Sequence, residues 1–205
     1  MTRILTIDPG GNTGIALGYF DAITPYQLLE RWQVHGGVEG FIQWWRGEGL
    51  KAHLTSEHIV VESFRLREEN DFAADLTPVM IEGALKALLI LDRSWHPPIV
   101  FQPPSDKGRL IGYSKEAQVM AGTRGKTRRQ RERFDFLERF GLFKAGTEND
   151  DSNDAITHAL VWLRKSKHAP TQNAFWPPRP RPEILLYNSD ISPDLRLASA
   201  EYPGF

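Results

Sequence analysis

The sequence predicts an α/β fold, and three of its features lead to this prediction. First, short strands at residues 4–7 and 13–17 flank a turn and therefore form a hairpin. Second, residues 58–64 (HIVVESF) contain a β-branched run that is typical of a central strand. Third, residues 78–91 are strongly apolar and residues 127–140 carry one apolar face, so both segments are expected to be helices.

The first strand ends at Asp8, and the next three residues turn the chain. Pro9 does so by fixing φ, and Gly10 and Gly11 by accepting positive φ. The turn places a carboxylate at the mouth of the hairpin. An acid at a rigid strand end beside a glycine turn can face either a metal ion or a phosphate. The other residues of the sequence are needed to distinguish these two possibilities.

Glycines mark several of the expected boundaries. Gly47 and Gly49 predict an interruption in a helix, Gly83 predicts close packing of its helix against the sheet, and Gly141 predicts a helix stop. The other expected elements are, in chain order, a strand at 26–33, the interrupted helix at 38–52, a charged loop at 65–75, a strand at 99–102, a loop at 103–107 and a helix at 150–163.

The composition is that of an ordinary soluble protein, with 40% hydrophobic and 25% charged residues. The absence of cysteine excludes disulfides, zinc–thiolate sites and thiol nucleophiles. No leader opens the chain, and no apolar run approaches the roughly 20 residues of a membrane span. These observations predict a cytoplasmic location and no membrane partner.

The 205 residues suffice for one domain with an appendage. Residues 176–182 (WPPRPRP) can neither continue a helix nor enter the interior of a sheet. We therefore expect a folded domain at residues 1–167 and a proline-rich, extended tail at residues 168–205, packed on the domain or on a partner.

Acidic residues occur at the ends of two expected strands and at the start of the last helix. Asp8 and Glu62 lie side by side if their strands are neighbours, and Asp151 and Asp154 share a helix face. Four close carboxylates repel one another and need cations to neutralise them. Oxygen ligands favour Mg²⁺ or Mn²⁺ over zinc, and two such ions can activate water and stabilise the leaving oxygen of a phosphodiester.

Each of these acids also has a simpler interpretation. Asp8 before Pro-Gly is typical of a turn residue, and Glu62 of a solvated strand end. Asp151 and Asp154 at a helix start are typical of capping and helix-dipole partners. Their joint occurrence in this order of elements favours a common site.

Three segments, IDPGGNTGIAL, IVVESF and DDSNDAITHALVWL, resemble the acidic motifs of the RuvC-like Holliday junction resolvases, which belong to the RNase H-like superfamily. The resemblance covers roughly residues 3–166. It implies a mixed five-stranded sheet flanked by helices, and a homodimer that nicks symmetrically related strands of a four-way DNA junction in a metal-dependent reaction. The basic helix and the proline-rich tail resemble phage-type members, which implies the host cytoplasm as the location.

The resemblance also implies roles for individual residues. Asp8, Glu62, Asp151 and Asp154 match the metal ligands, and Asp150 competes with Asp151 because it also shares a face with Asp154. Lys107 is similar in place to a lysine near the scissile phosphate, where it can stabilise transition-state charge; an ordinary loop lysine is the alternative. Phe64 lies near the place of an aromatic residue that helps to open the junction centre.

The segment at residues 122–133 (GTRGKTRRQRER) has a net charge of +5, in a chain whose total is −1. Such a density of basic side chains neutralises phosphates and predicts salt-dependent DNA binding, although many charge runs are simply solvated faces. The candidate DNA contacts are Arg124, Lys126, Arg128, Arg129 and Arg131, together with Phe64, Arg65 and Arg67 beside Glu62.

His158 lies one helical turn after Asp154 and either binds the metal or serves as a buried structural residue. Taken together, the sequence predicts a Mg²⁺-dependent endonuclease, with Mn²⁺ as an alternative cofactor, that resolves four-way junctions as a homodimer. Two alternatives remain on the same fold: a flap or branched-DNA endonuclease and a non-catalytic DNA-binding protein. An ATP-binding protein of the actin and sugar-kinase superfamily needs a second domain, for which 205 residues leave no room.

Overall fold

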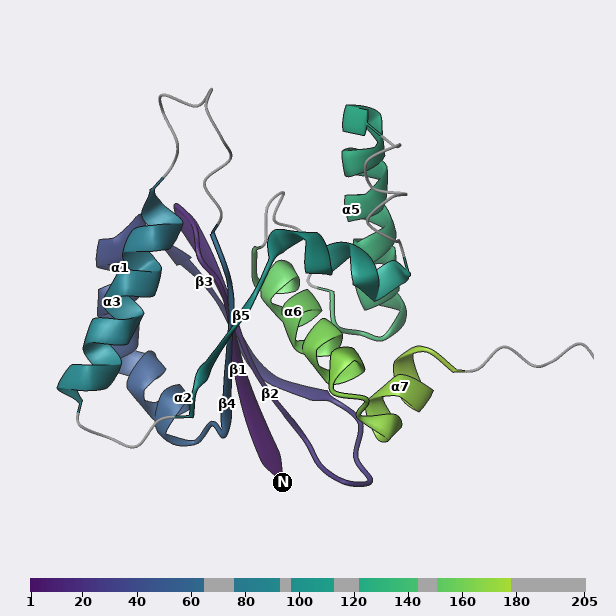
Figure 1. The fold of residues 1–205 in the computed structure, drawn as a ribbon, viewed down its shortest axis with the longest axis horizontal. Helices are drawn as coiled ribbons and strands as arrows, with labels where there is room; N and C mark the ends of the chain where they lie inside the picture. Colours follow the sequence, from purple (N-terminus) through teal and green to yellow (C-terminus); the bar gives the residue numbers. More distant parts are fainter. Residues whose placement is uncertain (65–75, 93–96, 113–121, 144–150, 178–205) are drawn as a thin grey trace, which may run out of the picture.

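A mixed five-stranded sheet forms the centre of the molecule in the computed structural model (Figure 1). The structure describes residues 1–64, 76–92, 97–112, 122–143 and 151–177, and the side chains of residues 122–128 lie outside this description. The strands are β1 (Thr2–Asp8), β2 (Asn12–Phe20), β3 (Gln27–His35), β4 (His58–Glu62) and β5 (Ile99–Gln102), in the spatial order β3-β2-β1-β4-β5. This arrangement confirms the predicted fold class.

The register of the sheet brings the predicted acidic strand ends together. β2 pairs antiparallel with β1 and β3, and β4 pairs parallel with β1 and β5. Ile7 is opposite Val61, so the next residues along these strands, Asp8 and Glu62, leave the same edge of the sheet. Strand β4 has hydrogen-bonded neighbours on both sides, as its β-branched run predicted.

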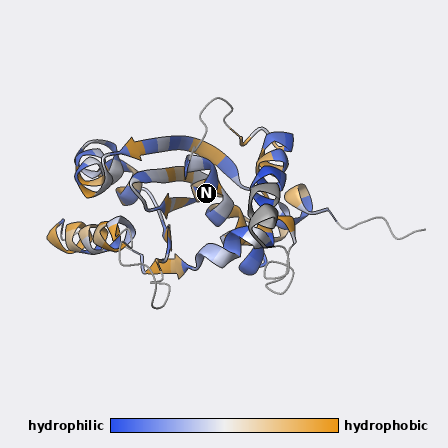
Figure 2. Ribbon diagram, turned by 90° about the horizontal axis from the view of Figure 1, so that it is seen from above, coloured by the Kyte–Doolittle hydropathy of each residue, from blue (hydrophilic) through white to orange (hydrophobic). Residues whose placement is uncertain are grey.

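Two helical layers cover the sheet (Figure 1). One face carries α1 (Gly37–Trp44), the π-helical turn η1 (Trp45–Gly49), α2 (Leu50–Leu54) and α3 (Thr77–Leu91). The other carries the 3₁₀ helix η2 (Pro104–Ile111), α5 (Gly122–Arg139), α6 (Asp151–Lys165) and α7 (Ala169–Phe175). Hydrophobic and hydrophilic residues alternate along the helices (Figure 2), because the helices that pack on the sheet turn an apolar face toward it, whereas α5 packs on η2 and α6.

The sheet separates two hydrophobic cores. Alternate residues of β1 point to opposite faces, so Ile4 joins the core beneath α6 while Leu5 and Ile7 join the core beneath α1 and α3. Helix α6 is largely buried because it lies directly on β1 and β2. Its first turn, which carries the acids, is thereby held against the ends of these strands.

Two predicted helix features are confirmed. The interruption at Gly47 and Gly49 is the turn η1, where a side chain at Gly49 would meet the Trp44 ring 2.7 Å away. Helix α5 stops at Gly141, which has a φ of 67°. The N–H of Gly141 donates to Glu138 and that of Leu142 to Leu137, an arrangement that satisfies the last carbonyls of the helix.

Four local predictions differ from the structure. Gly10 and Gly11 do not have positive φ; the turn is closed instead by Thr13, whose hydroxyl bonds to Gly10. A side chain at Gly83 would meet nothing within 4 Å, so this glycine does not serve close packing. Residues 103–107 do not form an open loop, because most of them begin η2.

The fourth difference concerns the tail. Residues 169–175 form α7 rather than an extended chain, and Phe175 is buried in the core beneath α6. His168 caps this helix, since its side chain accepts a hydrogen bond from the Thr171 N–H. The predicted loop at 65–75 and the proline-rich residues from 178 onward lie outside the described residues, and the division at residue 167 stays a prediction. Among the described helices, none is long and apolar enough to cross a bilayer.

Candidate metal centre

Three carboxylates from different elements surround the ammonium group of Lys107. Nζ of Lys107 lies 3.0 Å from Asp8, 2.6 Å from Glu62 and 2.8 Å from Asp154. Asp8 ends β1, Glu62 ends β4 and Asp154 lies in the first turn of α6. The structure therefore brings together three of the four predicted acids and the predicted lysine. It places a cation at the point where these acids converge.

The fourth acid, Asp151, faces the same region but has a different partner. Its carboxylate accepts a hydrogen bond from the Gln33 amide at 2.8 Å, and the oxygen of that amide accepts from the Ser152 N–H. Burial is the main cause that raises the pKa of Asp151, and Asp8 and Asp154 add to it. Its competitor Asp150 lies outside the described residues.

The charges in the cluster are unequal. Burial lowers the pKa of Lys107, but the three carboxylates outweigh this effect and raise it, so the ammonium stays charged. Burial likewise raises the pKa of Asp154, but Lys107 and Arg133 outweigh it and hold this carboxylate ionised. Arg133 reaches Asp154 from α5 at 3.2 Å. Among the described side chains, Lys107 is the one cation that pairs with Asp8.

The excess negative charge of the cluster therefore acts mainly on the pKa of Asp8. Burial, with Glu62 and Asp154 beside it, raises the pKa of Asp8 from 3.8 to about 8, although Lys107 opposes the shift. A divalent cation at this point would remove the repulsion between ionised Asp8 and its acidic neighbours, because it would neutralise two carboxylates at once. The donor set of the cluster and the position of the Lys107 ammonium thus fit a divalent metal ion.

We predict that Asp8 makes the metal-free protein less stable as the pH rises. Between about pH 4 and about pH 8 the unfolded chain has released the Asp8 proton while the folded chain retains it, so the free energy of unfolding falls across this range. Asp8→Asn lacks this titration. In urea unfolding with a chelator, its stability advantage over the wild type should grow by more than about 1 kcal/mol between about pH 5 and pH 8. An advantage independent of pH would contradict the assignment.

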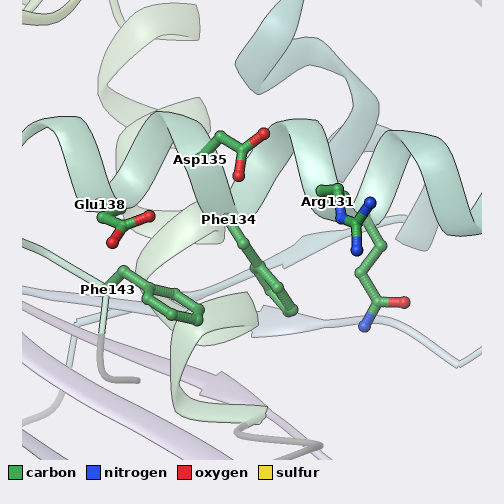
Figure 3. A pocket seen from close by; sticks show the side chains of 6 residues that line it. Arg131, Phe134, Asp135, Glu138 and Phe143 are labelled. Atoms are coloured by element: carbon green, nitrogen blue, oxygen red, sulfur yellow. The ribbon is translucent and has the colours of Figure 1, made fainter. Parts of the chain in front are cut away.

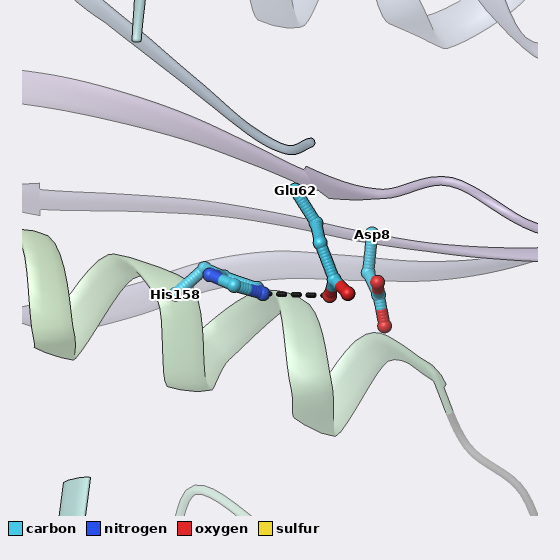
Figure 4. A group of neighbouring side chains, drawn as sticks. All are labelled: Asp8, Glu62 and His158. Carbon is cyan, nitrogen blue, oxygen red and sulfur yellow. Dashed lines mark hydrogen bonds and ion pairs between the residues drawn. The ribbon is translucent and has the colours of Figure 1, made fainter. Parts of the chain in front are cut away.

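His158 completes the cluster from the next turn of α6 (Figure 4). Its Nε2 lies 2.8 Å from the Glu62 carboxylate and its Nδ1 lies 2.8 Å from the Gln102 side chain. Asp8, Glu62 and His158 each offer one ligand atom, and these atoms all lie within 4.8 Å of one another. His158 is fully buried and its ring contacts Glu62, so the burial is observed, while metal binding by His158 stays a prediction.

Gly14 allows α6 to approach the sheet at this point. A side chain there would lie 1.9 Å from the Asp151 carbonyl oxygen, and Gly14 is opposite Asp8 in the hairpin. We predict that Gly14→Ala displaces the first turn of α6 and costs more than about 2 kcal/mol of stability, together with most of the metal affinity. Gly11→Ala is the matched control, since nothing lies within 4 Å of its added carbon. Equal stability of the two variants would contradict this prediction.

The basic helix α5 lies beside the cluster through Arg133. Arg129 is half-buried and Arg131 is exposed, whereas the side chains of Arg124, Lys126 and Arg128 lie outside the described residues, as do Arg65 and Arg67.

On another face of α5, a cavity of about 300 Å³ is lined by Arg131 and by the Phe134 and Phe143 rings, whose centroids are 5.2 Å apart (Figure 3). Among the described side chains of α5, Phe136 and Leu137 are buried in the core.

Phe64 follows Glu62 by two residues and is partly buried. Its backbone N–H donates a hydrogen bond to the Glu82 carboxylate of α3, at 3.0 Å. This contact holds the backbone just beyond the acidic cluster. Contact of Phe64 with DNA stays a prediction.

Solved structures show which fold this is. Thermus thermophilus RuvC in complex with Holliday junction substrate matches 82% of this chain and 98% of its own, with a TM-score of 0.52 and 15% identity. The fold is that of RuvC. A second structure of Thermus thermophilus RuvC gives a TM-score of 0.51, with 15% identity over 80% of this chain and 96% of that one.

The RuvC-like fold extends to a eukaryotic protein. The yeast mitochondrial Holliday junction resolvase Ydc2 has a TM-score of 0.50 and 17% identity, over 85% of this chain and 84% of its own. No family model and no curated protein sequence matches the chain. At these identities the comparisons establish the RuvC-like fold, and the chemistry has to be argued from the residues.

Sequence reasoning missed three residues of the site. Gln33 orients Asp151, Gln102 contacts His158, and Arg133 contacts Asp154. Gln102 was detectable in principle, because it ends a parallel strand and is opposite Glu62 in the register. Arg133 was within the basic segment but was not among the candidate contacts.

Proposed function

We propose that this chain is a divalent-metal-dependent endonuclease that resolves four-way DNA junctions. The observation that carries the proposal is the convergence of Asp8, Glu62 and Asp154 on one cation position at the carboxyl ends of parallel strands. Buried acids in this arrangement destabilise a protein unless a cation neutralises them. The likeness in fold to a RuvC bound to Holliday junction substrate supports DNA as the substrate class.

The metal ligands would be Asp8, Glu62 and Asp154, with Asp151 and His158 adjacent. Carboxylates favour Mg²⁺ or Mn²⁺. When bound, such a cation supplies activation of water and stabilisation of the leaving oxygen. Lys107 would then leave the carboxylates and offer its charge to the phosphate at the same edge, where it would offset the negative charge of the transition state.

Helix α5 is the proposed DNA-binding surface. Its segment 122–133 carries the densest positive charge of the chain, and Arg133 of this helix forms an ion pair with Asp154 of the acidic cluster. The exposed Arg131 offers a phosphate contact, and the Phe134 and Phe143 rings offer an aromatic surface for an unpaired base in a cavity that Asp135 and Glu138 also line (Figure 3). Because Arg133 of the same helix contacts Asp154, DNA bound along α5 would lie near the metal ligands.

We predict that Arg131→Ala weakens DNA binding about equally for all sequences. Loss of one phosphate contact should reduce the slope of log affinity against log salt by about one. The slope is measured by fluorescence anisotropy over a range of salt concentrations. Arg46→Ala, which removes an exposed arginine from η1 on the opposite helical layer, should leave the slope unchanged. An equal loss in both variants would contradict the assignment of α5.

A second copy of the chain is the proposed partner, because paired nicks in a pseudo-symmetric junction need two active sites. Helix α3 offers an apolar face for this contact: Met80 is 57% exposed, Ile90 72% and Leu91 74%. Exposed apolar residues grouped on one helix are unfavourable in a monomer. The homodimer is tested by sedimentation, in which Met80→Glu combined with Ile90→Glu should halve the mass.

The function is tested by incubating end-labelled four-way junction, flap and linear duplex DNA with Mg²⁺ or Mn²⁺. We expect symmetric nicks in the junction and little cutting of the duplex. Cutting of flaps or branches without symmetry would instead support the alternative endonuclease on the same fold. Binding of junctions without cleavage in either metal would contradict catalysis and support the non-catalytic DNA-binding protein. The phage origin and the cytoplasmic location stay predictions of the sequence.

A further inference from the structure

A buried chain of hydrogen-bonding groups leads from β5 into the metal centre. Gln102 is 1% exposed and His158 is fully buried. The side-chain oxygen of Gln102 lies 2.8 Å from Nδ1 of His158, and Nε2 of the same ring lies 2.8 Å from Glu62 (Figure 4). The amide nitrogen of Gln102 is buried and has no hydrogen-bond partner among the residues that the structure describes. Gln102 therefore makes its described side-chain contact with the histidine alone.

The protonation of the imidazole follows from these surroundings. A neutral imidazole carries a single N–H, which only one of its two nitrogens can donate. The Gln102 oxygen 2.8 Å from Nδ1 can only accept, so a ring that donates to it carries its proton on Nδ1 and presents a lone pair at Nε2.

That lone pair faces the Glu62 carboxylate, which is also an acceptor. Two acceptors at 2.8 Å repel each other unless a cation lies within reach of both. Metal-binding histidines in proteins show the same pattern, since they donate their other ring N–H to an oxygen acceptor that fixes the ring. Asp8 lies on the other side of Glu62 and offers a further oxygen (Figure 4).

We propose that Nε2 of His158 is a nitrogen ligand of the metal centre and that Gln102 is the positioning residue that keeps this nitrogen free of a proton. This inference rests on the proposed function, because it assumes that the acidic cluster holds a divalent metal ion. It adds that the site has mixed nitrogen and oxygen ligands. Imidazole suits transition-metal ions, so the site selects Mn²⁺ over Mg²⁺ rather than treating them alike.

The test uses the full chain with Mn²⁺ alone, in the absence of DNA. Pulsed electron paramagnetic resonance detects a ¹⁴N nucleus bound directly to Mn²⁺, and calorimetry gives the affinity. We expect nitrogen coupling in the wild type. Gln102→Leu, which cannot accept the Nδ1 proton, should lose the coupling and bind Mn²⁺ about 10–100-fold more weakly.

Two variants separate positioning from folding. Gln102→Glu keeps an oxygen acceptor at Nδ1 and should restore both the nitrogen coupling and the affinity. Gln172→Leu removes a partly buried glutamine of α7 that bonds to Arg164, away from the cluster, and should change neither. Thermal unfolding of each variant checks that the fold is retained.

The outcomes distinguish this inference from the function on which it rests. Mn²⁺ bound without nitrogen coupling would overturn the role of His158 and leave an all-oxygen metal centre in place. Coupling that persists in Gln102→Leu at unchanged affinity would overturn the role of Gln102. A failure of the wild type to bind Mn²⁺ would overturn the metal centre itself, and with it the proposed nuclease.

Discussion

Glu62→Gln is expected to lower the rate of junction cleavage by at least about 10³-fold, equivalent to about 4 kcal/mol of transition-state stabilisation. Glu62 occupies the middle of the cluster: its carboxylate contacts both Lys107 and His158, and it lies beside Asp8. The amide has nearly the same shape but no charge, so the fold should persist while the metal affinity collapses. Single-turnover cleavage at saturating Mg²⁺ or Mn²⁺ measures the loss.

Glu48→Gln serves as the matched control. Glu48 is about half exposed and pairs with Lys51 on the surface, so the same chemical change should leave the cleavage rate within about twofold of the wild type. Binding of junction DNA should be retained in both variants, because the basic helix is untouched. If Glu62→Gln cleaved at the wild-type rate, the cluster would not be the catalytic centre.

Lys107→Met is expected to produce the largest change in stability. The ammonium is the cation shared by Asp8, Glu62 and Asp154, and its removal leaves these buried or partly buried acids facing one another. Breaking a buried ion pair in this way costs about 3–5 kcal/mol. Urea unfolding near pH 8 with a chelator measures this loss in the metal-free protein.

Metal ions should reverse most of that loss. Because Lys107 and a divalent ion compete for the same carboxylates, Mn²⁺ should stabilise Lys107→Met by more than it stabilises the wild type. Lys51→Met, which removes a surface pair with a 76% exposed lysine, should change stability by less than about 1 kcal/mol with or without metal. If Lys107→Met were as stable as the wild type in the presence of chelator, Lys107 would not be the group that neutralises the cluster.

The sequence was sufficient to predict the centre of the fold and the acids on its strands. Asp8 and Glu62 end strands whose apolar, β-branched residues make them recognisable, and parallel neighbours end at the same edge of a sheet. The acids of α6 follow from helix spacing, which places residues three apart on one face. In each case a local pattern determines where the side chain points.

The remaining parts of the site depend on contacts between elements that are distant in the sequence. Gln102 meets His158 across 56 positions of the chain, and Gln33 meets Asp151 across 118. No local periodicity marks such a pair. The helix α7 was missed for a related reason: the prolines that follow it suggested an extended tail, whereas Phe175 joins the core and stabilises a helix there.

The central claim is that the acidic cluster is a catalytic metal centre, and anomalous diffraction tests it most directly. Crystals of the chain soaked in Mn²⁺ should show an anomalous peak in contact with Asp8, Glu62 and Asp154, with the Lys107 ammonium displaced from them. Lys107 still bridging the three carboxylates, with no Mn²⁺ peak among them, would contradict the account.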